Sequence, residues 1–240
     1  MTRICSYLPS LTDMEIVLAS RNKKKIAELS TLLSKYCGDK ITVLSLDDIG
    51  YEGDIEEDGA SFWENSVIKA CAPAKMGYIG IADDSGLCVD ALNGAPGVYS
   101  ARYSGDDATD AKNNEKLLKE LENTDNRKAK FETVISVVIP KSLGLRVFHP
   151  MTDPEMEEYI LKRFGIDAHV CSCGGECEGE ILHEMRGDGG FGYDPLFFVT
   201  EKGKTFSELS AEEKNEISHR GRAMRCFCDS MNILIEDNEL

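Results

Sequence analysis

The stretch Ile-Ala-Asp-Asp-Ser-Gly-Leu at residues 81–87 constrains the fold more than any other part of the chain, because an apolar run ends there in two acids, a hydroxyl and a glycine. A buried strand that ends in paired acids delivers metal-ligand or general-base oxygens to the edge of a sheet. Gly86 would let the backbone turn without a side chain in the way. A plain surface turn is the alternative, since Asp, Ser and Gly are common turn residues.

A strand, a polar loop and a helix follow one another near the start of the chain. Residues 15–19 read Glu-Ile-Val-Leu-Ala, which is typical of a short buried strand, and apolar residues recur at helical spacing from Ile26 to Leu33. The intervening Ser-Arg-Asn-Lys-Lys-Lys at 20–25 would direct backbone N–H groups, a helix dipole and lysines to one side. This order predicts an anion site, with a solvated basic helix start as the alternative.

Further elements can be placed coarsely along the chain. Strands are predicted at 41–46, 79–83, 131–139 and about 180–182, and helices after Ser61, over 110–121, from Thr152 to Gly165 and through 224–234. Ser61 and Glu64 form a capping box, which is a fully structural explanation of Glu64. Asn65 and Lys69 are four residues apart and share a helix face, so this helix can also carry polar groups toward a cleft.

Two glycine-rich loops and a histidine complete the polar inventory. The loop at 94–105 is long enough to suggest a functional segment. In the segment at 187–198, glycines can bring the backbone close to a flat or charged group, and the neighbouring aromatic rings could stack on a base. His219 beside Arg220 is weak on its own, because such a pair is more often a helix cap or a surface pair.

Composition limits the partners. The 240 residues are 42% hydrophobic, which suits one large domain or two small lobes. A formal net charge of -16 repels nucleic acid and anionic membranes, so an anionic substrate would need local Lys and Arg, a divalent metal, or both. Residues 1–13 have no export signal, no run is long enough to span a membrane, and nine cysteines then favour free thiols in a cytoplasmic protein.

Together these motifs are the inventory of a metal-dependent nucleotide enzyme. The sequence lacks the glycine-rich loop ending in Lys-Ser or Lys-Thr that P-loop enzymes use, which disfavours kinases and GTPases of that type. It also lacks a dinucleotide fingerprint after the first predicted strand, which argues against hydride transfer.

Six ordered motifs, from about Met14 to the last helix, resemble the inosine triphosphate pyrophosphatase family, which hydrolyses non-canonical purine nucleoside triphosphates. The motifs lie at 18–25, 61–65 with Lys69-Ala70, 82–87, 94–103, 190–195 and 218–221. The resemblance implies an α/β fold in which a long mixed central sheet is flanked by helices, with a cleft between two lobes, usually in a homodimer. It further implies that residues 14–240 form a single two-lobed domain, after an extension at 1–13 and with an insertion at about 150–173.

The same resemblance implies a reaction and roles for individual residues. Inosine, deoxyinosine or xanthosine triphosphate would be hydrolysed to the monophosphate and pyrophosphate. Glu64 and Asp84 would hold Mg²⁺, which Mn²⁺ can replace, while Asp84 activates water and Lys25 assists catalysis. The implied substrate-binding residues are Ser20, Arg21, Asn22, Lys23, Lys24, Lys25, Ser85, Phe191, Gly192, Tyr193, Asp194, Lys214, His219 and Arg220.

Phe191 would stack on the purine, and Tyr193 and Asp194 would complete this side of the base-binding site. Donors from His219 and Arg220 would satisfy a 6-keto oxygen and would face the amino group of adenine, which leaves buried groups unpaired.

Some assignments stay open. Arg21 stands where the family commonly has glycine, and it either contacts phosphate or points to solvent. Alternation on a strand sends Asp83 and Asp84 to opposite faces, so Asp83 is expected to support a lysine or the loop after Gly86.

Alternatives also remain for the cysteines and for the function. Cys171 and Cys173 would share one face of a strand, and free thiols on an inserted hairpin, together with Cys177, are favoured over zinc. A pyrophosphatase with a different base preference, or a non-catalytic nucleotide-binding protein, is the alternative function.

Overall fold

The computed structural model describes residues 14–21, 23–147 and 152–239. Seven strands form one mixed sheet in the order β2-β1-β3-β4-β5-β6-β7. The strands β1 (Met14–Leu18), β2 (Ile41–Ser45) and β3 (Ile79–Val89) are parallel, whereas β4 (Lys128–Pro140), β5 (Ala168–Ile181), β6 (Phe197–Val199) and β7 (Lys204–Thr205) add to β3 in antiparallel succession. The predicted α/β fold with a long mixed sheet is confirmed.

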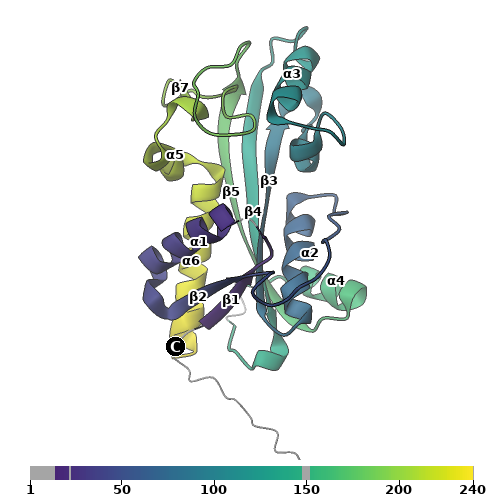
Figure 1. Cartoon of the computed structure of the whole chain (residues 1–240), viewed down its shortest axis with the longest axis vertical. Helices are drawn as coiled ribbons and strands as arrows, with labels where there is room; N and C mark the ends of the chain where they lie inside the picture. The colour runs from purple at the N-terminus through teal and green to yellow at the C-terminus, as the bar shows by residue number, and fades with distance from the viewer. Residues whose placement is uncertain (1–13, 22, 148–151, 240) are drawn as a thin grey trace, which may run out of the picture.

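Two lobes share the three long strands β3, β4 and β5, which run through the whole length of the molecule (Figure 1). In the lower lobe, α1 (Lys23–Cys37) and α6 (His219–Asp237) cover one face of the sheet, and α2 (Phe62–Lys75) and α4 (Pro154–Phe164) cover the other. The upper lobe contains α3 (Asp110–Glu120), α5 (Ala211–Ile217) and the short strands β6 and β7. No helix in the described ranges is long and apolar enough to cross a membrane.

The sheet separates three hydrophobic cores, and β3 contributes to each of them in turn. Ile81 is buried under α1 and α6, Ala82 is buried under α2, and Leu87 belongs to the core of the upper lobe. Between these positions, residues 83–85 are only half-buried. The paired acids therefore lie at the waist between the lobes, where no core covers the strand.

The expected strand end at these acids is wrong, because β3 continues to Val89 and pairs with β4 throughout. Gly86 does not make a turn. A Cβ at this position would lie 2.4 Å from the Gly97 carbonyl oxygen and 2.5 Å from Ser100 Oγ, so the glycine lets the 97–102 segment pack directly on the strand. The polar residues thus interrupt the burial of the strand without ending it.

The strand predicted at about 180–182 begins twelve residues earlier, at Ala168, and is a central strand of the sheet. The cysteines at 171, 173 and 177 therefore lie in β5, and the inserted hairpin is wrong. Cys171 and Cys173 do share a face, as predicted, and both are buried in the core under α6. At Gly175, a Cβ would lie 2.2 Å from the His219 carbonyl oxygen, so the start of α6 crosses β5 there in close contact.

Several helix boundaries are set by capping residues, of which Ser61 was predicted. Ser61 caps α2 by accepting a hydrogen bond from the Glu64 amide at 3.1 Å. In α4, Asp153 is the N-cap, Pro154 is the first helical residue, and Gly165 ends the helix with a φ of +69°. The described part of the segment predicted as an insertion is therefore α4 and the beginning of β5, while residues 1–13 lie outside the described residues.

Candidate active site

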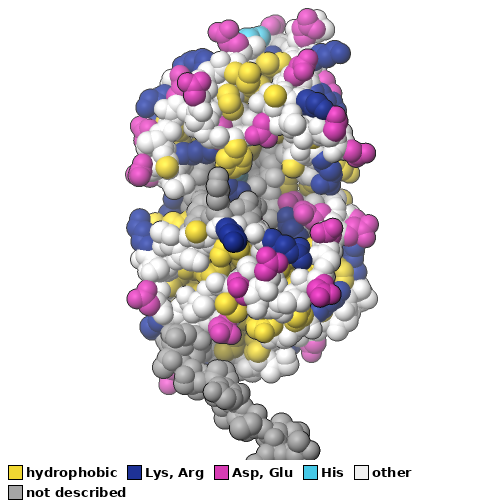
Figure 2. Space-filling model, viewed as in Figure 1, with side chains coloured by type: hydrophobic (Ala, Val, Ile, Leu, Met, Phe, Trp, Pro, Cys, Tyr) yellow, Lys and Arg dark blue, Asp and Glu magenta, His cyan; other side chains and the backbone are white. Residues whose placement is uncertain are grey.

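A hollow separates the two lobes, and Lys and Arg side chains lie along its rim (Figure 2). The lower wall carries Asp84 on β3 and polar side chains of α2. In the upper lobe, Lys214 on α5 lies over the ring of Phe191, and we call this group of residues the upper wall. The predicted site residues that the structure describes come from both lobes, with Glu64 and Asp84 in the lower lobe and Asp194 and Lys214 in the upper lobe.

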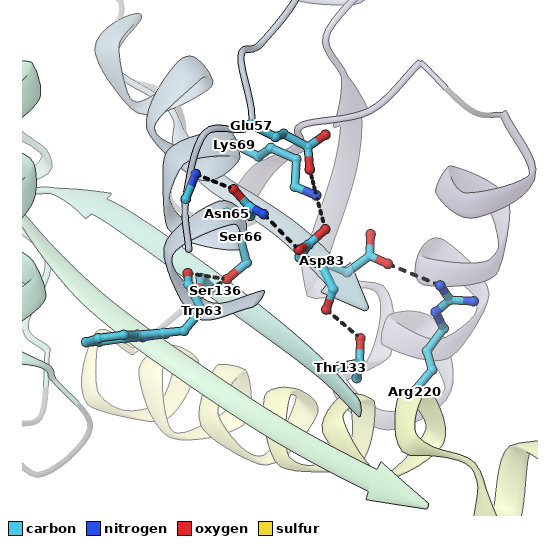
Figure 3. Close-up of polar contacts among 11 residues, drawn as sticks. Glu57, Trp63, Asn65, Ser66, Lys69, Asp83, Thr133, Ser136 and Arg220 are labelled. Atoms are coloured by element: carbon cyan, nitrogen blue, oxygen red, sulfur yellow. Dashed lines mark hydrogen bonds and ion pairs between the residues drawn. The ribbon is translucent and has the colours of Figure 1, made fainter. Parts of the chain in front are cut away.

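Asp84 is held by two side chains of α2. Its Oδ1 accepts a hydrogen bond from Lys69 Nζ at 2.8 Å, and its Oδ2 accepts one from Asn65 Nδ2 at 3.4 Å. Lys69 Nζ also donates to Glu57 Oε2 at 2.8 Å (Figure 3). Burial raises the pKa of the Asp84 carboxyl, and the charge of Lys69 opposes this rise. The result is a fixed, partly desolvated carboxyl group that can accept a proton.

A chain of hydroxyl groups fixes α2 on the sheet beside Asp84. Ser66 Oγ lies 2.7 Å from Ser136 Oγ on β4 (Figure 3). Ser136 Oγ in turn lies 2.8 Å from Ser172 Oγ on β5. Trp63 Nε1 donates to Ser172 Oγ at 3.1 Å. Because Ser66 and Ser136 are fully buried, these bonds are shielded from water and define how α2 presents Asn65 and Lys69.

Asp83 faces the opposite side of the sheet, as alternation predicts. Its Oδ2 accepts a hydrogen bond from Arg220 Nη2 at 3.2 Å, at the start of α6 (Figure 3). Asp83 therefore orients an arginine. Ser85, half-buried, lies opposite Thr133 in the sheet, and Thr133 Oγ1 donates to the Asp84 carbonyl at 3.0 Å.

The predicted order of strand, polar loop and helix is confirmed for β1 and α1. Lys23 is the exposed first residue of α1, and Ser20 is half-buried in the loop. Asn22 and the side chains of Lys24 and Lys25 lie outside the described residues. The phosphate-binding role of this loop stays a prediction.

Arg21 has partners that neither of its two interpretations anticipated. Its Nε donates to Asp47 Oδ1 at 3.0 Å, and its Nη2 donates to the carbonyl oxygens of Tyr51 and Gly53, both at 2.9 Å. The guanidinium therefore ties the loop after β2 to the loop after β1.

Glu64 has a structural partner. Its Oε2 accepts a hydrogen bond from the Ala60 amide at 2.6 Å, so the reciprocal half of the predicted capping box falls one residue before Ser61. Glu57, linked to Asp84 through Lys69, is a carboxylate that the sequence interpretation did not single out, although it belongs to the acidic run at 54–58.

The carboxylates at the lower wall could hold a divalent cation such as Mg²⁺ only together with ligands from the substrate and water. Within the described residues, no three His, Cys, Asp or Glu side chains form a metal-binding group by themselves. Mg²⁺ is usually held by one or two carboxylates together with substrate phosphates and water. Asp84, with a further carboxylate from α2 or the preceding loop, fits that pattern.

The upper wall is organised by Asp194, which is almost fully buried. Its Oδ2 accepts hydrogen bonds from the Phe191 amide at 2.9 Å and from Lys214 Nζ at 2.6 Å. The ring of Phe191 is 65% exposed, and Lys214 Nζ lies 5.1 Å from its centroid. Asp194 thus holds the Phe191 turn and the Lys214 side chain together.

Tyr193 and His219 lie deeper than predicted. The hydroxyl of the buried Tyr193 donates a hydrogen bond to the Ser100 carbonyl at 2.9 Å, so Tyr193 anchors the Phe191 turn to the 97–102 segment. The ring of His219 stacks on Phe131 with centroids 4.8 Å apart, and burial lowers its pKa to about 3, helped by the charges of Arg220 and Lys214. His219 is therefore neutral at physiological pH.

A comparison with protein families assigns the chain. The model of the Ham1 family matches residues 16–230. The chain belongs to the Ham1 family. This confirms the resemblance read from the six motifs, because the match spans β1, both walls of the cleft and most of α6.

Relatives and solved structures of the Ham1 type cover nearly the whole chain. A dITP/XTP pyrophosphatase from Desulforamulus reducens is 42% identical over 95% of this chain and all of the relative, and one from Escherichia coli K12 is 41% identical over 90% of this chain and 98% of the relative. A HAM1 protein from Coxiella burnetii superposes with a TM-score of 0.77 at 39% identity, covering 92% of this chain and 99% of that structure. The Ham1 protein of Staphylococcus aureus gives 0.73 at 37% identity, over 90% and 97%.

Proposed function

We propose that this Ham1 protein hydrolyses non-canonical purine nucleoside triphosphates, namely inosine, deoxyinosine and xanthosine triphosphate, to the monophosphate and pyrophosphate. The names of the relatives support this activity. The observation that carries the proposal is the half-buried Asp84 carboxyl, fixed at the waist by Lys69 and Asn65, in a chain whose upper lobe exposes the ring of Phe191.

Asp84 is the general base in this proposal. It accepts a proton from water as the water oxygen adds to the α-phosphorus. The bond from this phosphorus to the oxygen that bridges the α- and β-phosphates breaks, so that pyrophosphate leaves. Burial, which raises the Asp84 pKa, makes the carboxylate a stronger base. Lys69 and Asn65 hold the two carboxylate oxygens in place during the proton transfer.

We assign Mg²⁺ to Asp84 and Glu64, with Mn²⁺ able to replace it. When bound, the cation neutralises negative charge as the pyrophosphate leaves. Lys25 and the other residues of the loop at 20–25 contact the phosphates, where the start of α1 directs its N–H groups.

Base recognition is assigned to the upper wall and to the start of α6. The exposed ring of Phe191 offers a face for stacking on the purine. Arg220, oriented by Asp83, donates to the 6-keto oxygen together with His219, and the amino group of adenine would oppose these donors. The resemblance carries two more proposals, a homodimer and a cytoplasmic location.

Pyrophosphate release with Mg²⁺ from deoxyinosine, xanthosine, guanosine and adenosine triphosphates tests the activity. The proposal expects rapid release from the first two and slow release from adenosine triphosphate, whose 6-amino group opposes the donors. Guanosine triphosphate, which also has a 6-keto oxygen, tests whether the site excludes a 2-amino group. Equal turnover of all four would contradict the base preference, and release of orthophosphate would contradict the reaction. Binding without turnover would favour a nucleotide-binding protein.

A further inference from the structure

The turn that carries Phe191 is hydrogen-bonded to α3, a helix to which the sequence interpretation assigned no function. The Gly192 amide donates to Asp110 Oδ2 at 2.7 Å, and the Gly192 carbonyl accepts from Asn114 Nδ2 at 2.9 Å. Asp110 and Asn114 are four residues apart on α3 and so project from one face of the helix. One residue of the turn is therefore held through both of its backbone polar groups.

These contacts matter because the turn has little rigidity of its own. Gly190 and Gly192, on either side of Phe191, have φ angles of +77° and +61°, in the left-handed region that glycine visits freely. The ring of Phe191 is 65% exposed, so packing contributes little to its position. The place of the ring is set through the backbone, by α3 from one side and by Asp194 from the other.

α3 is itself fixed to the strand that carries Asp84. Asn113 Nδ2 donates to the Ser100 carbonyl at 3.3 Å, and Ser100 Oγ accepts a hydrogen bond from the Leu87 amide on β3 at 2.9 Å. Tyr193, next to Gly192, donates to the same Ser100 carbonyl. The stacking ring and the proposed base thus share one frame, because α3 is fixed to β3 three residues beyond Asp84.

The burial of Asn114 is a second, independent indication. The side chain is 4% exposed, and among the described residues its Oδ1 has no hydrogen-bond partner. A buried polar atom without a partner lowers stability, and a leucine of similar size would avoid that penalty. An amide at this position is explained by its donation to Gly192.

We propose that Asp110 and Asn114 are positioning residues for base recognition, which set the affinity for the purine by fixing the Gly192 peptide groups and hence the ring of Phe191. The inference rests on the proposed function. Neither residue touches the substrate, so their effect passes through Phe191 and concerns binding of the base, not the rate of the chemical step.

A double-mutant cycle tests this inference. Phe191→Ala is expected to raise KM for deoxyinosine triphosphate at least about fivefold, the lower range for base–aromatic stacking. Asp110→Ala should raise KM in the same direction, with kcat within about twofold of wild type, since general-base chemistry is untouched. In the Phe191→Ala background, Asp110→Ala should have no further effect. Asp107→Ala removes an exposed Asp three residues away that binds Lys112, and it is the matched control with unchanged KM.

Product binding separates a base-specific effect from general damage. Titration calorimetry with Mg²⁺ should show weaker binding of deoxyinosine monophosphate to Asp110→Ala and Asn114→Leu, and unchanged binding of pyrophosphate, which has no base. Additive effects in the cycle, or equal losses for both products, would overturn the inference. If wild type bound deoxyinosine monophosphate but did not hydrolyse the triphosphate, the proposed function would fail while the calorimetric cycle still tested α3.

Discussion

The two walls of the cleft hold their functional groups by different means. On the lower wall, the carboxyl group of Asp84 is held by the side chains of Lys69 and Asn65 on a long helix. On the upper wall, the ring of Phe191 stands on a glycine-flanked turn whose backbone is held from α3 and Asp194. A general base must have its carboxylate oxygens held in position, whereas a stacking ring needs only the right orientation of its plane relative to the purine. The lower wall should therefore control rate, and the upper wall affinity.

The sharpest test of this division is Asp84→Asn. The amide cannot accept the proton from water, so kcat should fall by at least about 100-fold, the usual lower contribution of a general base. Single-turnover hydrolysis of deoxyinosine triphosphate measures it, with deoxyinosine monophosphate binding as the check that the upper wall is intact. Wild-type kcat in this variant would refute the division of labour.

A second test asks whether the buried His219, which stacks on Phe131, stays uncharged. The folded pKa of His219 lies near 3, below its ordinary value of 6.5, so the unfolded chain takes up a proton below pH 6.5 that the folded chain does not. The stabilising contribution is fully present above pH 6.5 and is lost on acidification, at about 1.4 kcal/mol per pH unit.

Between pH 7 and pH 5, His219 should thus account for about 2 kcal/mol of the loss in unfolding free energy. Urea unfolding at both pH values should show a correspondingly smaller loss for His219→Gln. Equal losses for the two proteins would mean that His219 is protonated in the folded state.

Asp83→Asn sharpens the comparison on the other face of β3, where Asp83 orients Arg220, a residue assigned to base recognition. This substitution is chemically the same as Asp84→Asn one residue away, but it weakens the hydrogen bond that orients Arg220. Loss of a charge-assisted hydrogen bond at a partly exposed position predicts a rise in KM of about fivefold with little change in kcat. A loss in kcat as large as that of Asp84→Asn would show that the two acids act as a catalytic pair.

The smallest effect on kcat and KM is expected from the cysteines buried in the core under α6, away from both walls. Burial raises the pKa of Cys171 and of Cys173 to about 12, so both thiols stay protonated at neutral pH and are poor metal ligands. Cys171→Ala and Cys173→Ala should keep kcat and KM within about twofold of wild type, by the same assay. Stoichiometric zinc in wild type that disappears in these variants, measured by elemental analysis, would show a metal site instead.

Local patterns in the sequence predicted local structure well. The strand, loop and helix around residue 20, the cap Ser61, the helix end at Gly165, and the opposite faces of Asp83 and Asp84 all depend on near neighbours in the chain. The end of β3 was misplaced because consecutive polar residues in the middle of a central strand have the same sequence pattern as a turn. β5 was recognised only at its end, since its glycines and cysteines have little strand preference.

The contacts that organise the upper wall could not be predicted in the same way. Asn114 and Gly192 are 78 residues apart and meet through a backbone carbonyl, which leaves no periodicity in the sequence. The bond between Arg21 and the carbonyls after β2 is of the same kind. Glu57 had a visible signal, the acidic run, but only the fold selects one carboxylate from that run.

The continuity of β3, β4 and β5 through both lobes makes the protein indivisible. Any boundary drawn at the waist cuts all three strands, so neither lobe can be excised, inherited or exchanged as a module. Each lobe would lose half the length of its central strands and expose their unpaired ends. Recognition and chemistry can therefore diversify in this architecture by changing side chains and loops, but not by recombining lobes.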